Sequence, residues 1–149
     1  MVDIQKLIFA ILSSALPMAA TLAPFSDDAK VLQGVWTPVK WELAGSATPP
    51  PSMSAMKLTL KDAQFEFLEG KSLDAGRFEL KPGQTPKEMD IVGVKGPNAG
   101  RTIPTIYRIQ GDRLTVCYGL DGHRPKSFLS PKKSMILLVV FSRKPLIKR

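Results

Sequence analysis

The sequence has few of the residues that disulfides, metal sites and hydrolytic triads require. It contains one cysteine, Cys117, and one histidine, His123. A disulfide within the chain needs two cysteines, so none can form. Zinc sites usually draw on several Cys or His ligands, and a hydrolytic triad needs a His held between partners. We expect His123 to be a solvated turn residue and Cys117, inside "RLTVCYGL", to occupy a buried position in a strand.

Other signatures of catalysis and cofactor binding are missing as well. The segment "GPNAG" at residues 96–100 has neither the lysine nor the following helix of a phosphate loop. Asp27 and Asp28 are not followed by the spaced acids of a calcium loop, and they are typical of the start of a helix. The sequence therefore predicts no catalytic residue, no cofactor and no metal site, and we expect no enzymatic activity.

The apolar run near the N-terminus is too short for a comfortable membrane span, which needs about 20 residues. Lys6 is followed by the apolar run Leu7–Leu16 and then by small residues up to Ala23. This order is typical of a secretory signal peptide. We expect residues 1–23 to be removed on export to the periplasm, the envelope or the exterior, which leaves no membrane span. The alternative is an N-terminal helix that is buried or tethers the protein to a membrane.

The rest of the chain is rich in strand patterns. "MKLTLK", "QFEF" and "RFELK" alternate apolar with polar residues, which indicates one buried and one solvated face. "RTIPTIYRIQ" and "RLTVCYGL" are joined by Gly111-Asp112 alone, a strong hairpin signal. Phe128 is expected at the start of a further strand. The run "MILLVVFSRK" could be a helix by pattern, but its β-branched residues favour a strand covered on both faces.

These patterns predict an all-β fold. A meander of about eight antiparallel strands leaves two exposed edges unless it closes into a small up-and-down barrel. An open sandwich is the alternative. We expect one barrel domain over residues 34–144, with a short helix in residues 24–33 before it and a basic tail at 145–149 after it. The residues expected to point inward include no carboxylate, His or Lys, and they are Val39, Trp41, Leu58, Leu60, Phe65, Phe67, Phe78, Leu80, Ile91, Tyr107, Ile109, Leu114, Val116 and Tyr118.

The stretch Gly34-Val35-Trp36, between the expected helix and the first strand, resembles the Gly-x-Trp signature of lipocalins. Together with "MKLTL", "DIVGVKGPNAGRTIPTIYRIQGDRLTVCYG" and "HRPKSF", it resembles an uncharacterised lipocalin-like domain family of exported planctomycete-type bacterial proteins, over residues 30–144. The resemblance implies a barrel but no reaction and no ligand. It also implies that Trp36 plugs one barrel end and that Arg143 packs across its ring.

One feature of the first strand conflicts with simple alternation. Trp36 is out of step with Val39 and Trp41, so both tryptophans can face inward only if a β-bulge resets the alternation. We expect that bulge near Thr37-Pro38, because proline cannot donate a ladder hydrogen bond.

Four residues are candidates for ligand binding. If Tyr107 and Tyr118 both face inward beside Trp41, their hydroxyls supply polar groups in an apolar cup. Alternatively, each hydroxyl bonds to the backbone in a filled core. Arg124, next to Pro125, could close the barrel mouth or receive an anionic group, or it could pack against an aromatic ring or a carbonyl-rich loop.

Two functions are favoured at this point, and an enzyme whose site these patterns do not reveal is a third alternative. The first is a module that binds a small apolar or amphipathic ligand, and a cavity of about 300 Å³ or more that opens to solvent would support it. The second is an envelope interaction domain with a solid core, whose net charge of +8 meets an anionic polymer or protein. That function would place Lys132, Lys133, Arg143 and Lys148 on one face. Export argues against nucleic acid as the partner. The net charge can also belong to a simple solvated surface with no charged partner. We expect the protein to be a monomer.

Overall fold

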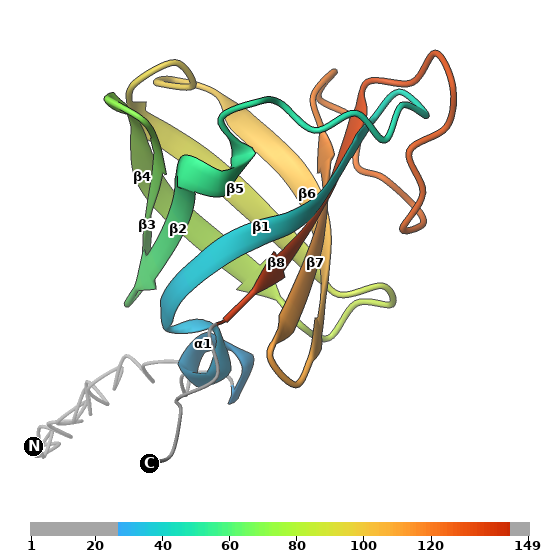
Figure 1. Ribbon diagram of the computed structural model, residues 1–149. Helices are drawn as coiled ribbons and strands as arrows, with labels where there is room; N and C mark the ends of the chain where they lie inside the picture. Colours follow the sequence, from blue (N-terminus) through green and yellow to red (C-terminus); the bar gives the residue numbers. More distant parts are fainter. Residues whose placement is uncertain (1–26, 144–149) are drawn as a thin grey trace, which may run out of the picture.

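The computed structural model describes residues 27–143, which form a closed β-barrel (Figure 1). Each strand pairs antiparallel with the next along the chain, and the last strand pairs with the first. The predicted all-β barrel of eight strands is therefore confirmed, and the open sandwich is not observed. The strands are β1 (Gly34–Leu43), β2 (Met56–Lys61), β3 (Gln64–Glu69), β4 (Ser72–Lys81), β5 (Glu88–Lys95), β6 (Thr102–Gln110), β7 (Arg113–Gly119) and β8 (Ile136–Ser142).

Among residues 27–143, helical structure is limited to two short segments. Helix α1 (Asp27–Leu32) precedes β1, and the 3₁₀ turn η1 (Met53–Ala55) precedes β2. Two acidic residues in the first turn of α1 and Lys30 in its last turn complement the helix dipole. The expected leader at 1–23, the first residues of the expected helix segment and the basic tail lie outside the described residues. Within residues 27–143, no helix has the length and apolar character that crossing a membrane requires.

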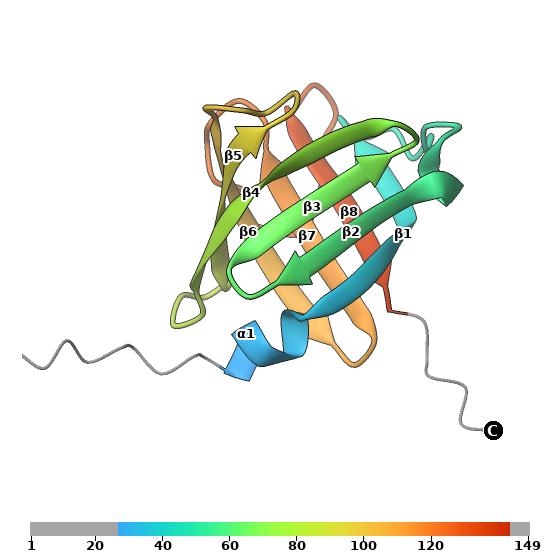
Figure 2. The ribbon, with the colours of Figure 1, turned by 90° about the vertical axis from the view of Figure 1, so that its left-hand side faces the viewer.

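The two ends of the barrel differ in how they are covered. At one end, which we call the closed end, α1 lies across the opening beside the β2–β3, β4–β5 and β6–β7 connections (Figures 1 and 2). The opposite end, which we call the open end, carries the β3–β4 turn and the longer loops 44–55, 96–101 and 120–135. The strands run obliquely around the barrel between these ends.

A bulge in β1 resolves the conflict in its alternation. The register against β8 shifts between Pro38 and Lys40, which leaves Val39 as the extra residue. Trp36 and Pro38 are buried before the bulge, and Trp41 packs against the core after it. The bulge lies one residue later than expected. For that reason the predicted inward position of Val39 is wrong, and its side chain is 44% exposed.

A second apolar cluster lies on the outer face of the wall. Ile106, Cys117 and Leu138 are neighbours on β6, β7 and β8, in alternation with inward-facing residues. Phe128, from loop 120–135, covers this cluster, and the guanidinium carbon of Arg108 lies 4.6 Å from the centroid of its ring. Cys117 is buried, as expected. The strand expected at Phe128 is wrong, because this segment lies over the sheet as a loop and is not part of it.

Candidate functional site

The closed end is sealed by an indole and a guanidinium group. Trp36 is fully buried, and its Nε1 donates a hydrogen bond to the Leu32 carbonyl at 2.8 Å. The guanidinium carbon of Arg143 lies 4.1 Å from the centroid of the Trp36 ring, and this guanidinium also donates to the Val31 carbonyl. Gly34 adopts a φ of 121° between α1 and β1, a conformation that glycine alone adopts readily. The structure thus brings Gly34, Trp36 and Arg143 together as a plug.

Tyr107 belongs to the closed end and not to a ligand cup. Its hydroxyl donates to Asp28 Oδ2 at 2.7 Å, and Lys87 Nζ lies 2.9 Å from the same oxygen. Burial and the neighbouring carboxylate raise the pKa of Tyr107 well above its usual value. Tyr107 therefore fixes α1 to the barrel, and its partner is a carboxylate where the sequence suggested either a ligand or the backbone.

This contact predicts a loss of stability in acid. Burial alone would raise the pKa of Asp28, but hydrogen bonds from Lys87 and Tyr107, together with the Lys87 charge, outweigh burial and lower it. A carboxyl with a lowered pKa stabilises the fold at pH above its unfolded-state pKa of about 4, and this contribution is lost as pH falls through the folded-state value.

We expect the free energy of unfolding, measured with urea, to be lower at about pH 3 than at neutral pH. Lys87→Met removes the cation that holds the Asp28 pKa down, so this variant should show a smaller difference between the two conditions. Lys71→Met, at the β3–β4 turn, is the control and should keep the wild-type difference. An unchanged acid response in Lys87→Met would contradict the assignment.

Between the plug and the open end, the barrel interior is not filled. It contains a cavity of about 180 Å³. This is smaller than the roughly 300 Å³ typical of sites for drug-sized ligands, but slightly larger than a cavity of about 150 Å³ that holds benzene. Its wall is almost entirely apolar, and the lining residues are Trp41, Leu58, Leu60, Phe65, Phe67, Asp74, Met89, Ile91, Asn98, Ile103, Leu114, Val116, Tyr118, Leu120, Leu137, Val139 and Phe141.

Two of the predicted site residues, Trp41 and Tyr118, line this cavity. The Tyr118 hydroxyl has no hydrogen-bond partner in the part of the chain that the structure describes. Burial raises the pKa of Tyr118 well above its usual value, so the phenol stays neutral. It can therefore both donate and accept a hydrogen bond inside the cavity.

Two further polar residues reach the cavity at the open end. Asp74 Oδ2 accepts a hydrogen bond from Asn98 Nδ2 at 2.5 Å, and Asp74 Oδ1 accepts a weaker one from the Asn98 backbone at 3.4 Å. Arg101 donates to Asn98 Oδ1 at 3.1 Å and to the Leu120 carbonyl at 3.0 Å. Loop 96–101 is thereby held over the rim of the barrel. A Cβ at Gly93 would lie 1.9 Å from the Asn98 carbonyl oxygen, so glycine is required for this close approach.

Asp74 and Asn98 were not among the predicted site residues. The alternating pattern marks a strand only from Arg77, whereas β4 begins at Ser72. Extending the alternation of Phe78 and Leu80 toward the N-terminus puts Asp74 on the same inward face. That signal was present but weak, because Ala75 and Gly76 interrupt the apolar pattern.

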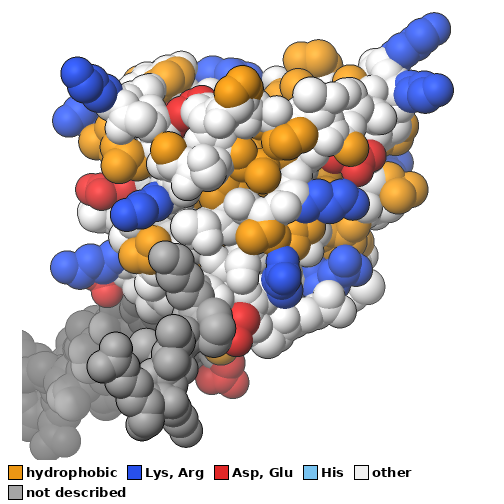
Figure 3. All heavy atoms as spheres, in the orientation of Figure 1, with side chains coloured by type: hydrophobic (Ala, Val, Ile, Leu, Met, Phe, Trp, Pro, Cys, Tyr) orange, Lys and Arg blue, Asp and Glu red, His pale blue; other side chains and the backbone are white. Residues whose placement is uncertain are grey.

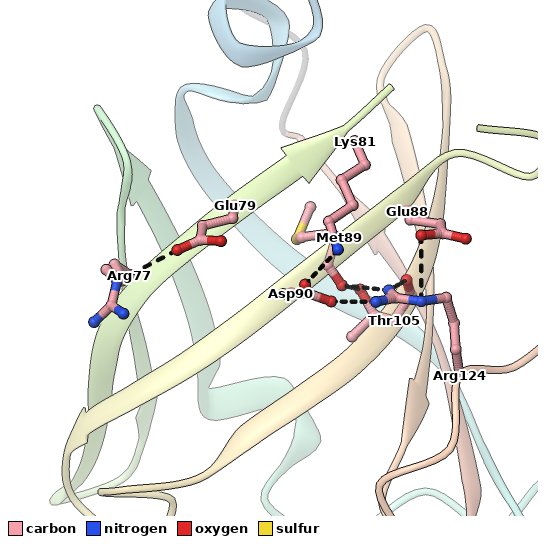
Figure 4. A network of polar contacts seen from close by, with 8 residues as sticks. All are labelled: Arg77, Glu79, Lys81, Glu88, Met89, Asp90, Thr105 and Arg124. Atoms are coloured by element: carbon pink, nitrogen blue, oxygen red, sulfur yellow. Dashed lines mark hydrogen bonds and ion pairs between the residues drawn. The ribbon is translucent and has the colours of Figure 1, made fainter. Parts of the chain in front are cut away.

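Arg124 is not among the described residues that line the cavity, and Figure 4 shows its guanidinium beside β5 and β6. Its NH1 donates to the carbonyls of Met89, at 3.2 Å, and Thr105, at 2.7 Å. Its NH2 pairs with Asp90, and its Nε lies 3.3 Å from Glu88 Oε2. Arg124 neither closes the mouth nor faces a ligand there. It fastens loop 120–135 to the outer face of β5 and β6, and the carbonyls that it contacts belong to these strands and not to the carbonyl-rich loop considered as an alternative.

Of the four basic residues expected on one face, the three that the structure describes do not gather there. Lys132 and Lys133 lie in loop 120–135 at the open end, whereas Arg143 packs on Trp36 at the closed end. Lys148 lies outside the described residues. On the face shown in Figure 3, Lys and Arg side chains are dispersed, with apolar side chains between them.

Among residues 27–143, no three His, Cys, Asp or Glu side chains are grouped so that they could hold a metal ion. Comparisons of the chain with protein-family models, with curated proteins and with solved structures found no match.

Proposed function

We propose that this protein is an exported, lipocalin-like binding module that holds a small apolar or amphipathic ligand inside its barrel and catalyses no reaction. The observation that carries the proposal is the unfilled apolar cavity of about 180 Å³ beneath a polar rim. Small barrels are often filled by their own side chains. A cavity kept open by apolar residues, with few polar groups at one side, has the usual composition of a small-ligand site.

The volume limits the size of the ligand. Because a cavity of about 150 Å³ accommodates benzene, this one suits an aromatic ring with a short substituent, on the order of ten heavy atoms. A long-chain lipid does not fit without movement of the loops at the open end.

Several observations support the family and export parts of the proposal. The Gly-x-Trp triplet stands at the start of β1, and Arg143 lies over the Trp36 ring, the arrangement that the lipocalin resemblance implies. The pattern of residues 1–23 is that of a secretory leader. The alternative of a solid domain that binds anionic polymers is weaker, because the interior is not solid and the described basic residues named for it, Lys132, Lys133 and Arg143, do not share a face.

Binding can be tested with phenethyl alcohol, a probe of the right size. Trp41 lines the cavity whereas Trp36 is sealed in the plug, so a Trp36→Phe background makes Trp41 the only tryptophan reporter. We expect a saturable change in Trp41 emission. Val116→Phe should abolish it by filling the cavity, because Val116 is buried in the cavity wall. Val94→Phe, at an exposed site outside the barrel, should leave it intact.

Native mass spectrometry of the exported protein gives an independent measurement. We expect a small molecule to copurify with the wild-type chain and with Val94→Phe, and to be absent from Val116→Phe. Thermal unfolding of each variant must first show that the barrel is retained. If emission is insensitive to the probe and no bound molecule is found, the ligand-binding function is wrong.

A further inference from the structure

The charge inside the cavity indicates which ligands it selects. Asp74 is the one charged side chain among the described residues that line the cavity. In the part of the chain that the structure describes, it forms no ion pair with any Lys, Arg or His. Asp74 is half-buried at the rim, and a carboxylate beside an apolar wall is stabilised by a cation or by several donors.

The existing hydrogen bonds of Asp74 leave room for a ligand. Both come from Asn98, one to each carboxylate oxygen. A carboxylate offers about four acceptor positions, so about two remain open. A carboxylate accepts hydrogen bonds and does not donate them, so a ligand group that occupies the open acceptor positions must be a donor. A cationic donor makes the strongest hydrogen bond to a carboxylate.

The rest of the cavity favours a cation over an anion. Phe67 lies directly opposite Asp74 in the β3–β4 register, and Trp41 and Tyr118 line the same space. Aromatic faces attract ammonium groups. The Tyr118 hydroxyl can accept a further hydrogen bond. Among residues 27–143, no Lys or Arg lines the cavity, so an anionic ligand would meet the Asp74 charge with no described cation to offset it.

We propose that the ligand is a small amine, with its apolar or aromatic body in the barrel and its ammonium group at Asp74. This inference rests on the proposed ligand-binding function and adds the chemical class of the ligand. Asp74 is then both the recognition group for the ammonium and the residue that holds loop 96–101 over the bound molecule through Asn98.

Three probes of nearly equal size separate charge from shape. Phenethylamine carries an ammonium group, phenethyl alcohol is neutral, and phenylacetate is an anion. We expect calorimetric titration of the full chain at neutral pH to show the amine binding about tenfold tighter than the alcohol. One additional charged hydrogen bond supplies a gain in affinity of this size. The anion should bind most weakly.

A pair of variants assigns the preference to one residue. Asp74→Asn removes the cavity charge and should bring the affinities for amine and alcohol within about twofold of each other. Glu66→Gln removes the same charge from the exposed face of β3 and should keep the tenfold preference. Because Asp74→Asn also alters the contact with Asn98, the probe series on the unmutated protein remains the primary test.

The outcomes separate the two proposals. If the alcohol binds and the amine binds no tighter, the amine inference is overturned and the binding function stands. An amine preference that survives in Asp74→Asn also overturns the inference, because the ammonium would then lie elsewhere. If no probe binds to the unmutated protein, both the amine inference and the proposed function fail.

Discussion

Replacing Trp36 by Ala is expected to lower the free energy of unfolding by about 3–5 kcal/mol, the usual cost of truncating a fully buried tryptophan. The side chain is 0% exposed, and its removal deletes the hydrogen bond to Leu32 and the ring beneath Arg143. The guanidinium would then lie over an empty space. Urea unfolding followed by circular dichroism measures the change.

The matched control is Trp41→Ala. Trp41 is half-buried and borders a cavity that already exists, so less packing is lost and the expected cost is about 1–2 kcal/mol. Trp36→Phe keeps most of the ring area but not the indole N–H, and it should fall between the two. Equal losses for Trp36→Ala and Trp41→Ala would show that the closed end is not the more strongly packed one.

The second large effect is expected at Arg124. Arg124→Ala removes the donor to the carbonyls of Met89 and Thr105 and takes a cation away from Asp90 and Glu88. Leaving partly buried acceptors and charges without their partner costs about 2–4 kcal/mol. Burial alone would raise the pKa of Asp90, but hydrogen bonds and charges from Lys81 and Arg124 lower it, so part of the loss should disappear in acid.

Loop 120–135 provides a local measurement of the same substitution. Phe128 in this loop covers Cys117, which is fully buried. Once Arg124 no longer fastens the loop, a thiol reagent should label Cys117 faster. Arg77→Ala is the control from the same side of the barrel (Figure 4). Its ion pair with Glu79 is exposed, and such pairs contribute little. Unchanged labelling in Arg124→Ala would mean that other contacts hold the loop.

Most of the barrel could be predicted from local patterns. Alternation marks β2 and β3, and the two-residue connection Gly111-Asp112 predicts the β6–β7 hairpin with its register. The need for a bulge in β1 followed from Trp36 and Trp41 alone. The position of the bulge could not be predicted in the same way. Val39 can be recognised as the extra residue only from the pairing of β1 with β8, a strand about 100 residues away in the chain.

The candidate site was less accessible to prediction. Tyr107 and Tyr118 have the same alternation on one hairpin, yet one bonds to Asp28 at the closed end and the other lines the cavity. The position of each tyrosine along the barrel axis decides which of these surroundings it has. The local alternation of residues does not encode that position. The outer cluster under Phe128 was missed for a related reason: a loop can cover a strand without sharing its periodicity.

The position of the described chain ends has a practical consequence for how the protein can be mounted. Asp27 and Arg143 both lie at the closed end, where the Arg143 guanidinium reaches the Val31 carbonyl (Figure 1). A tether fused before α1 or after β8 therefore starts at the end of the barrel opposite the open end. On a sensor chip or a carrier particle, either attachment leaves the loops of the open end facing the bulk liquid.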